Sequence, residues 1–320
     1  MRKVKLTVFG LMFCLLLHLT GCAAAQKPLR VTLVLKTVTE VAEFWGTLLS
    51  GVEKAAEEYG IELEVLTSPR EIDIDKQIDL IRQVTEDKPD VMILSAADYD
   101  RCAEATEEAI AAGIGVVAID TDVNAAGRAC FVGSNSYEIG LEMGRAMASY
   151  LPEGGKVAVI QHMLTTTTGI ERTRGVLDAL NEAGNIEILG SFCCDNSTEQ
   201  AQTITTELLS ADPEIRGFVC TNEVCNVGAA NALVELGMGG RVYVVGCDNS
   251  QRQIQFLEQN IIQAIVTQRP FNMGYVAVQQ AVRVANGEQT DDFVEVSCVL
   301  ITRENMYTQE NQKLLFPVLR

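Results

Sequence analysis

From Leu29 onward, the chain alternates short runs of apolar, often β-branched residues with longer stretches of helical periodicity. Each short run is almost continuously apolar, as in the strands of a parallel sheet that is buried on both faces. Repeated strand–helix units predict parallel sheets joined by right-handed crossovers. We expect strands at 31–35, 61–66, 91–94, 115–119, 157–160, 186–190, 217–220, 242–246 and 262–266, and helices at 44–59, 76–86, 101–112, 138–150, 170–183, 199–209 and 224–236.

The number of expected strands and one break in the series favour two lobes. About nine strands are more than one doubly wound sheet of this helix spacing holds comfortably, and 320 residues suit either one large α/β unit or two lobes. The stretch "SYLPEGGKVAVI" interrupts the alternation with Pro152, Gly154 and Gly155 before a second series begins. The predicted fold class is therefore α/β, with two doubly wound parallel-sheet lobes.

The N-terminal segment "MRKVKLTVFGLMFCLLLHLTGCAAAQ" has the pattern of a secretory signal. A basic start precedes an apolar run from Leu6 to Leu19, which is short for a membrane span of about 20 residues. The run ends in "LTGC", which resembles the bacterial lipobox. We expect residues 1–21 to be a lipoprotein signal peptide, Cys22 to be lipidated and 22–29 to be a linker. The alternatives are an uncleaved anchor helix or a chance cysteine in a signal.

The charge of the chain disfavours nucleic-acid binding. From Cys22 onward there are 22 basic and 43 acidic residues, a net charge of −21, and no basic stripe interrupts them. Such a surface repels phosphates. Eight of the ten cysteines lie outside the signal without any C-x-x-C motif, and Cys220 and Cys247 end apolar runs. We expect most of these thiols to be free and to pack as small apolar groups.

Polar side chains follow several of the expected strands, at the sheet edge where ligands bind in open α/β folds. Any one of them is more often a helix cap or turn residue, and an arginine is more often a surface ion pair. Together, acids, amides and a guanidinium suit a neutral polyol, because each hydroxyl both donates and accepts. These segments are Asp120-Thr121-Asp122, Thr221-Asn222-Glu223, Asp248-Asn249 and Gln268-Arg269-Pro270, with Arg172 and Arg174 in "GIERTRG".

Seven stretches resemble the type I periplasmic sugar-binding proteins, the ribose- and galactose-binding family. They are "EFWGTLLSGVEKAAEEYGIEL", "AAGIGVVAIDTDV", "FVGSNSYEIGLEMGRAMASYL", "GIERTRGVLDAL", "TNEVCNVGAANAL", "VYVVGCDNS" and "IVTQRPFNMGYVAV". Their order and spacing, over about residues 30 to 300, make the resemblance specific. It implies two lobes joined by three crossovers, which close on a sugar about a hinge. The implied lobes are 30–134 with 269–296, and 135–268 with 297–320.

The resemblance also implies a role for individual side chains. Phe44 and Trp45 match paired aromatics that lie against the sugar; as a helix pattern alone, they would pass for core residues. The implied hydrogen-bonding residues are Asp120, Arg172, Asn222, Asp248 and Gln268, and further candidates are Lys36, Thr121 and Asn196. Lys36, just past the first strand, would supply a further donor, or else it is a solvated loop lysine. Where a ribose binder has Asn-Pro and an arginine, this chain has Ala42-Glu43 and Thr121, which makes ribose itself doubtful.

Other chemistries find little support in the sequence. Outside the signal the only histidine is His162, and no G-x-S-x-G, H-E-x-x-H, G-x-G-x-x-G or Walker motif occurs. We therefore predict no catalytic residue, no metal and no cofactor. Paired carboxylates such as Asp120 and Asp248 would also suit a glycosidase. A basic helix-turn-helix is absent from the N-terminus, which argues against a regulator of the same fold.

The predicted function is that of a lipid-anchored, extracytoplasmic binding protein at a bacterial membrane. It would capture a monosaccharide or polyol, act as a monomer and deliver the ligand to the permease of an ABC importer. The alternative is a sensor that presents the bound sugar to a histidine kinase or a chemoreceptor. Residues within the lobes do not separate these two functions.

Overall fold

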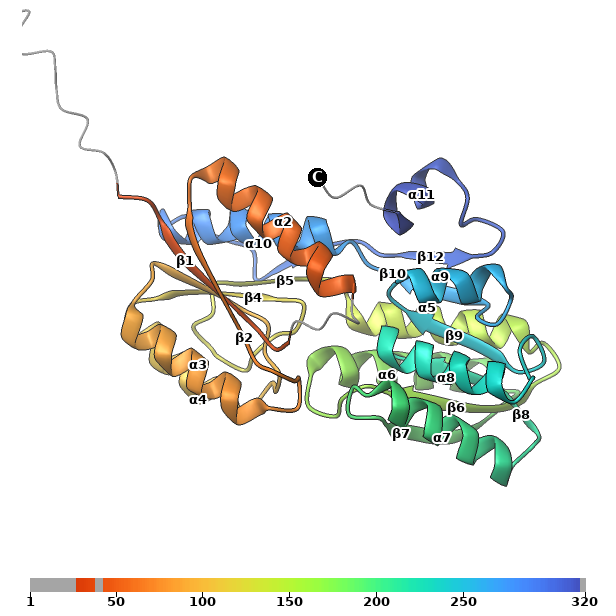
Figure 1. Cartoon of the computed structure of the whole chain (residues 1–320). Helices are drawn as coiled ribbons and strands as arrows, with labels where there is room; N and C mark the ends of the chain where they lie inside the picture. The colour runs from red at the N-terminus through yellow and green to blue at the C-terminus, as the bar shows by residue number, and fades with distance from the viewer. Residues whose placement is uncertain (1–26, 38–42, 317–320) are drawn as a thin grey trace, which may run out of the picture.

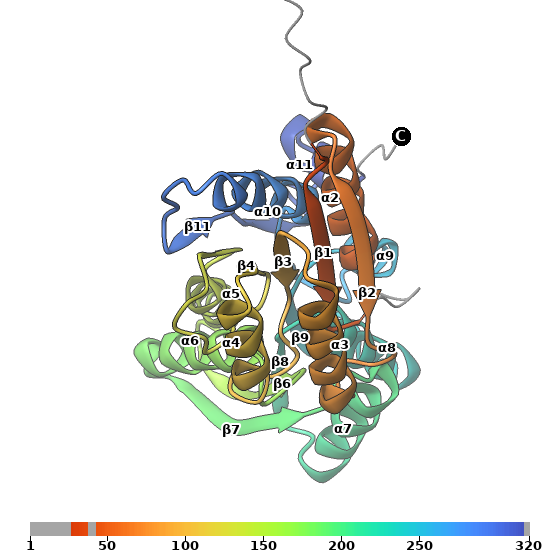
Figure 2. The same cartoon turned by 90° about the vertical axis from the view of Figure 1, so that its left-hand side faces the viewer.

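The computed structural model describes residues 27–37 and 43–316. They form two α/β lobes that lie side by side, each built on a six-stranded sheet (Figures 1 and 2). The expected fold class is confirmed. Cys22, the proposed signal and Ala42 lie outside the described residues. None of the helices within 27–37 and 43–316 combines the length and apolar character that a membrane span requires.

The first sheet has the strand order β11-β5-β4-β3-β1-β2, and all its pairings are parallel. Helices cover both of its faces, with α2 and α10 on one side and α3 and α4 on the other (Figure 2). Its elements are β1 (Arg30–Leu35), α2 (Glu43–Tyr59), β2 (Glu62–Thr67), α3 (Ile74–Asp87), β3 (Val91–Leu94), α4 (Ala103–Ala111), β4 (Gly115–Ile119), β5 (Cys130–Gly133), α10 (Pro270–Ala285) and β11 (Phe293–Glu295).

The second sheet repeats this plan with the order β12-β10-β9-β8-β6-β7. Helices α5 and α6 cover one face, and α7, α8 and α9 the other. Its elements are α5 (Ser136–Tyr150), β6 (Gly155–Gln161), α6 (Thr167–Ala183), β7 (Ile186–Cys193), α7 (Thr198–Ala211), β8 (Ile215–Cys220), α8 (Glu223–Glu235), β9 (Tyr243–Cys247), α9 (Gln251–Glu258), β10 (Ala264–Thr267), β12 (Val299–Thr302) and α11 (Gln309–Leu315).

The nine expected strands are all present, but the pattern does not predict β5, β11 and β12. These three are short, with three or four residues each, and two of them, β11 and β12, are edge strands. The edge strand β12 also pairs antiparallel with β10, so the second sheet is not wholly parallel. It is added after the last crossover, where the chain returns to the second lobe.

The chain passes between the lobes three times, after β5, after β10 and after β11. The first and third passages are held together by hydrogen bonds. The Ser134 hydroxyl donates to the Val296 carbonyl at 2.7 Å, and the Val296 amide donates to the Gly133 carbonyl at 2.8 Å. These short, paired connections leave little freedom for sliding, so the lobes can move mainly by rotation about this hinge.

Candidate functional site

A small cavity lies between the lobes, at the carboxyl ends of the strands of both sheets. Both sheets reverse their strand order near this edge, beside β1 and β6, which is where ligands bind in doubly wound folds. The cavity measures about 50 Å³, room for only a few water molecules. It is lined by Lys36, Thr37, Phe44, Trp45, Glu71, Asp120, His162, Thr168, Arg172, Asn196, Asn222, Glu223, Val224, Asp248 and Gln268.

Two aspartates occupy equivalent positions in the two lobes. Asp120 follows β4 and Asp248 follows β9, and both have left-handed backbones, with φ of 62° and 67°. The amide of each donates to the neighbouring strand, to the carbonyls of Val132 at 3.0 Å and Val266 at 2.8 Å. This conformation is uncommon away from glycine, and it turns both carboxylates into the cavity.

The carboxylate of the first lobe is paired with Lys36, which comes directly after β1. The Lys36 ammonium lies 2.8 Å from Glu71 and 3.5 Å from Asp120, and the lysine is only 3% exposed. Burial lowers the pKa of Lys36, but the two carboxylates outweigh it and leave the pKa raised. Burial raises the pKa of Asp120, against the opposing effects of Lys36 and Arg172. Lys36 is therefore a buried ammonium near neutral pH.

In the second lobe, Arg172 is the cation that lies beside the aspartate, as Lys36 is in the first. It projects from α6 and is 2% exposed. One terminal nitrogen donates to the Thr221 carbonyl at 2.9 Å and lies 3.7 Å from the Asp248 carboxylate. Gln268 donates to the other oxygen of Asp248 at 2.6 Å. The Nε of Arg172 is buried without a partner among the described residues, so a donor remains available to a ligand.

Phe44 and Trp45 stand in the first turn of α2 and form an edge-to-face pair, with ring centroids 5.1 Å apart. Trp45 is 6% exposed and packs in the apolar core of the first lobe, while it also lines the cavity. The Lys36 ammonium lies 5.6 Å from its ring centroid, within cation–π range. Phe44 is only partly buried. The pair is thus both core and cavity wall, and the two interpretations of the sequence are not exclusive.

A chain of polar side chains crosses from one lobe to the other. Asn222 donates to Asn196 at 2.8 Å, and Asn196 donates to Glu71 of the first lobe at 2.7 Å. Asn222 is also the N-cap of α8, because its side-chain oxygen accepts from the Cys225 amide at 3.0 Å. It is therefore a helix cap and a cavity residue at once, and this contact helps to hold the cleft closed.

Two further titratable groups of the second lobe face the cavity. Glu223 is 4% exposed, and one of its oxygens has no partner among the described residues. Burial, followed by the charge of Asp248, raises its pKa to about 8. Burial, followed by Lys36 and Arg172, holds the pKa of His162 well below its usual value. Near neutral pH the imidazole is neutral, and the Glu223 carboxyl carries a proton in most molecules.

Thr121 is the one candidate that the structure places away from the cavity. It is fully buried, and its hydroxyl donates to the Ala96 carbonyl at 2.7 Å. The sequence reasoning missed Glu71, which lies in the turn after β2. His162 and Glu223 also follow predicted strands, but their residue types alone did not indicate a role. Inspecting the end of every strand, including β2, would have found all three.

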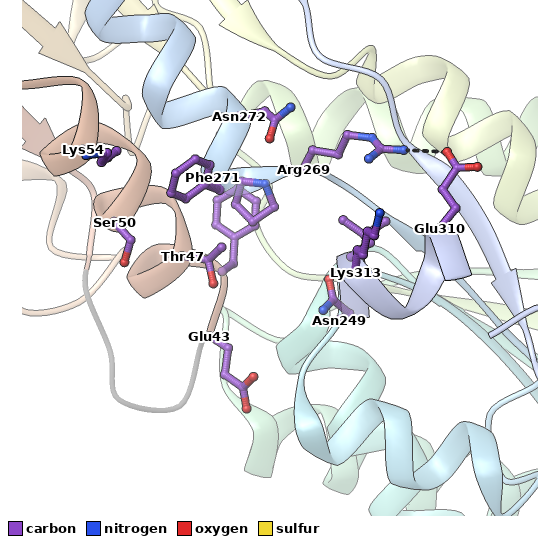
Figure 3. Close-up of a pocket in the computed structure, with 13 residues that line it drawn as sticks. Glu43, Thr47, Ser50, Lys54, Asn249, Arg269, Phe271, Asn272, Glu310 and Lys313 are labelled. Atoms are coloured by element: carbon purple, nitrogen blue, oxygen red, sulfur yellow. Dashed lines mark ion pairs between the residues drawn. The ribbon is translucent and has the colours of Figure 1, made fainter. Parts of the chain in front are cut away.

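A second and larger cavity of about 570 Å³ lies beside the hinge, between α2, the start of α10 and α11 (Figure 3). Its walls are partly exposed, and it carries charges on exposed side chains such as Lys54 and Lys313. Arg269 and Glu310 approach to 3.7 Å across it. The buried pairs Lys36–Glu71 and Arg172–Asp248 and the Nε of Arg172, unpartnered among the described residues, belong to residues that line the smaller cavity, so we assign the ligand site there in spite of its size.

A family model described as periplasmic binding protein domain matches residues 32–289. The chain belongs to this family. It is 25% identical over 317 residues to the D-allose-binding periplasmic protein of Escherichia coli (strain K12), which covers 95% of this chain and 100% of that protein. It is 26% identical over 289 residues to the D-ribose/D-allose-binding protein of Pseudomonas aeruginosa, which covers 87% of this chain and 89% of that protein.

Solved structures give the same result for the fold. A sugar transporter from Clostridium phytofermentans superposes with a TM-score of 0.80 at 30% identity, covering 86% of this chain and 99% of that chain. A carbohydrate transporter solute binding protein from Agrobacterium radiobacter, in complex with D-arabinose, gives a TM-score of 0.87 at 22% identity, covering 91% and 100%. The predicted resemblance to type I periplasmic sugar-binding proteins is confirmed.

Proposed function

We propose that this protein captures a monosaccharide or a similar polyol between its lobes and delivers it to the permease of an ABC importer. The observation that carries the proposal is the inter-lobe cavity, which combines an aromatic wall with buried donors and acceptors from both lobes. Aromatic faces suit the C–H groups of a sugar, and paired carboxylates, amides and guanidinium suit its hydroxyls. The names of its relatives point to sugars and to transport.

The proposed mechanism is closure about the hinge. The cavity is too small for a sugar in the arrangement described, and Lys36 and Arg172 are almost fully buried. A ligand therefore enters an open form and is enclosed as the lobes rotate together. We assign ligand contacts to Phe44, Trp45, Asp120, Arg172, Asn222, Asp248 and Gln268, with Lys36 and Asn196 beside them, and add Glu71, His162 and Glu223.

We further propose that the protein is a monomer without a catalytic activity and that it is held at the membrane by lipid on Cys22. Proteins of this family are extracytoplasmic, and the relatives are named for binding rather than catalysis. The proposed lobe bounds are 30–134 with 269–296, and 135–268 with 297–320. Mass spectrometry of the membrane-extracted protein should find acyl chains on an N-terminal Cys22. An unmodified cysteine would refute the anchor and leave sugar binding standing.

A thermal-shift screen against monosaccharides and polyols tests the sugar proposal. A ligand at 100 times its dissociation constant stabilises the folded state by about 2.7 kcal/mol, which raises the Tm by several degrees in a chain of this size. Trp45 is the only tryptophan, so its fluorescence should change with the same ligand. If no sugar or polyol shifts the Tm, the ligand class is wrong, although the fold and family stand.

A further inference from the structure

Two buried thiols of the second lobe are in direct contact just beneath the ligand cavity. The Sγ atoms of Cys194 and Cys225 are 3.2 Å apart, and neither side chain has any exposed surface. Cys194 opens the loop after β7, and Cys225 lies in the first turn of α8, 31 residues further along the chain. Neither thiol takes part in the proposed ligand contacts, so their juxtaposition has no explanation in sugar binding.

The surroundings of the two sulfur atoms differ, and they shift the pKa values of the two thiols in opposite directions. The hydrogen bond with Cys225 lowers the pKa of Cys194. Hydrogen bonds from the backbone amides of Ser197 and Asn196 act in the same direction. Burial raises the pKa of Cys225 well above its usual value. The lowered pKa of Cys194 favours its thiolate, the nucleophilic form, within this hydrogen-bonded pair.

We propose that Cys194 and Cys225 form a disulfide when the protein meets an oxidising disulfide compound. The Cys194 thiolate attacks one sulfur of the external disulfide, forms a mixed disulfide and releases the first thiolate. Cys225 then loses its proton and attacks the Cys194 sulfur, which releases the second thiol. Two protein thiols are oxidised and one external disulfide is reduced to two thiols. Both steps need a local opening of the loop after β7, because the sulfur atoms are buried.

The bond would join two walls of the ligand cavity. Asn196 follows Cys194 by two residues, and Asn222 caps the helix turn that contains Cys225. The two asparagines already contact each other at 2.8 Å. A disulfide has an S–S distance of about 2.05 Å, so the loop and the helix would move together by roughly 1 Å. The polar chain that spans the cleft would then be anchored on a covalent link.

The test treats the full-length protein with oxidised glutathione and maps its peptides by mass spectrometry. We expect a peptide containing Cys194 linked to one containing Cys225, lighter by two hydrogens than the separate peptides. A link that closes a loop of this length should raise the Tm by roughly 5–10 °C, and dithiothreitol should reverse the rise. The experiment needs no sugar, so its outcome is independent of the proposed function.

Cys193→Ser is the matched control, because Cys193 is the adjacent, partly exposed thiol. This variant should keep both the link and the rise in Tm, whereas Cys225→Ser should lose both. If Cys225→Ser does not fold, the peptide map of the wild type still decides. The proposal is overturned if both thiols remain alkylatable after unfolding of the treated protein, or if Cys193 or Cys220 takes the place of either sulfur atom.

Discussion

The two lobes are built on the same plan, yet they offer a ligand different chemistry. Each sheet has the same order of its parallel strands, and each turns an aspartate into the cleft from a left-handed residue after an equivalent strand. The aromatic rings of the cavity come from the first lobe alone, on α2. Both lobes contribute polar side chains, but in the second lobe Val224 is the only apolar residue among the described residues that line the cavity.

This difference divides the work of recognition between the lobes. An apolar wall can hold one face of a sugar in the open form without aligning many hydrogen bonds. The polar groups of the second lobe act only when the cleft closes, because Asn196 and Arg172 must come within reach of the first lobe. Capture by the first lobe and selection by the second is the order that this arrangement favours.

The largest effect is expected for the folding stability of the first lobe in Trp45→Ala. Trp45 is almost fully buried, so its truncation should lower the free energy of unfolding by about 3–5 kcal/mol. Phe44→Ala is the matched control, because Phe44 is half-buried and should cost less in stability. Urea denaturation followed by circular dichroism measures both. Equal losses for the two variants would contradict the expectation that the deeper burial of Trp45 in the core makes it the larger contributor to stability.

Arg172→Ala tests the second lobe and should act on binding. Removing the guanidinium leaves the buried Asp248 without its cation. We therefore expect the binding free energy for the sugar identified by the screen to weaken by about 2–3 kcal/mol. Arg174→Ala is the control, because Arg174 lies two residues away on the same helix with its side chain 58% exposed. Isothermal titration calorimetry compares them. An unchanged affinity in Arg172→Ala would remove Arg172 from the site.

Much of this site is predictable, because a buried parallel strand appears in the sequence as an apolar run. The residue that follows the strand can then be identified directly. Asp120, Asp248 and Gln268 were found in this way, and they do meet at one cavity. Glu71 was missed because the segment "TSPREIDID" looks like a solvated turn, and only the fold brings its carboxylate to Lys36. Thr121 was expected near the ligand because it stands where a ribose binder has an arginine, but the left-handed turn at Asp120 directs it into the core.

Glu223 is one of the groups that are coupled electrostatically across the cleft, and it should make the stability of the protein depend on pH. Its neighbours include Asp248 of the second lobe and Glu43 of the first, and its pKa is raised from 4.5 to about 8. A carboxyl with a raised pKa in the folded state contributes its full stability below the unfolded pKa. That contribution is lost as the pH rises from about 4.5 through about 8, because the folded protein then holds a buried charge.

Glu223→Gln should therefore flatten the stability profile between pH 5 and pH 9. The amide keeps the shape of the protonated carboxyl and cannot ionise. Between pH 5 and pH 9 the free energy of unfolding should therefore fall less in the variant than in the wild type, and the difference should exceed about 1 kcal/mol. Glu207→Gln, on the exposed surface of α7, is the control and should follow the wild type. Urea unfolding at several pH values measures the profiles. Parallel profiles for wild type and Glu223→Gln would mean that Glu223 is solvated and that the cleft stands open in solution. The polar groups of the second lobe would then reach the first lobe only after a ligand has closed the cleft.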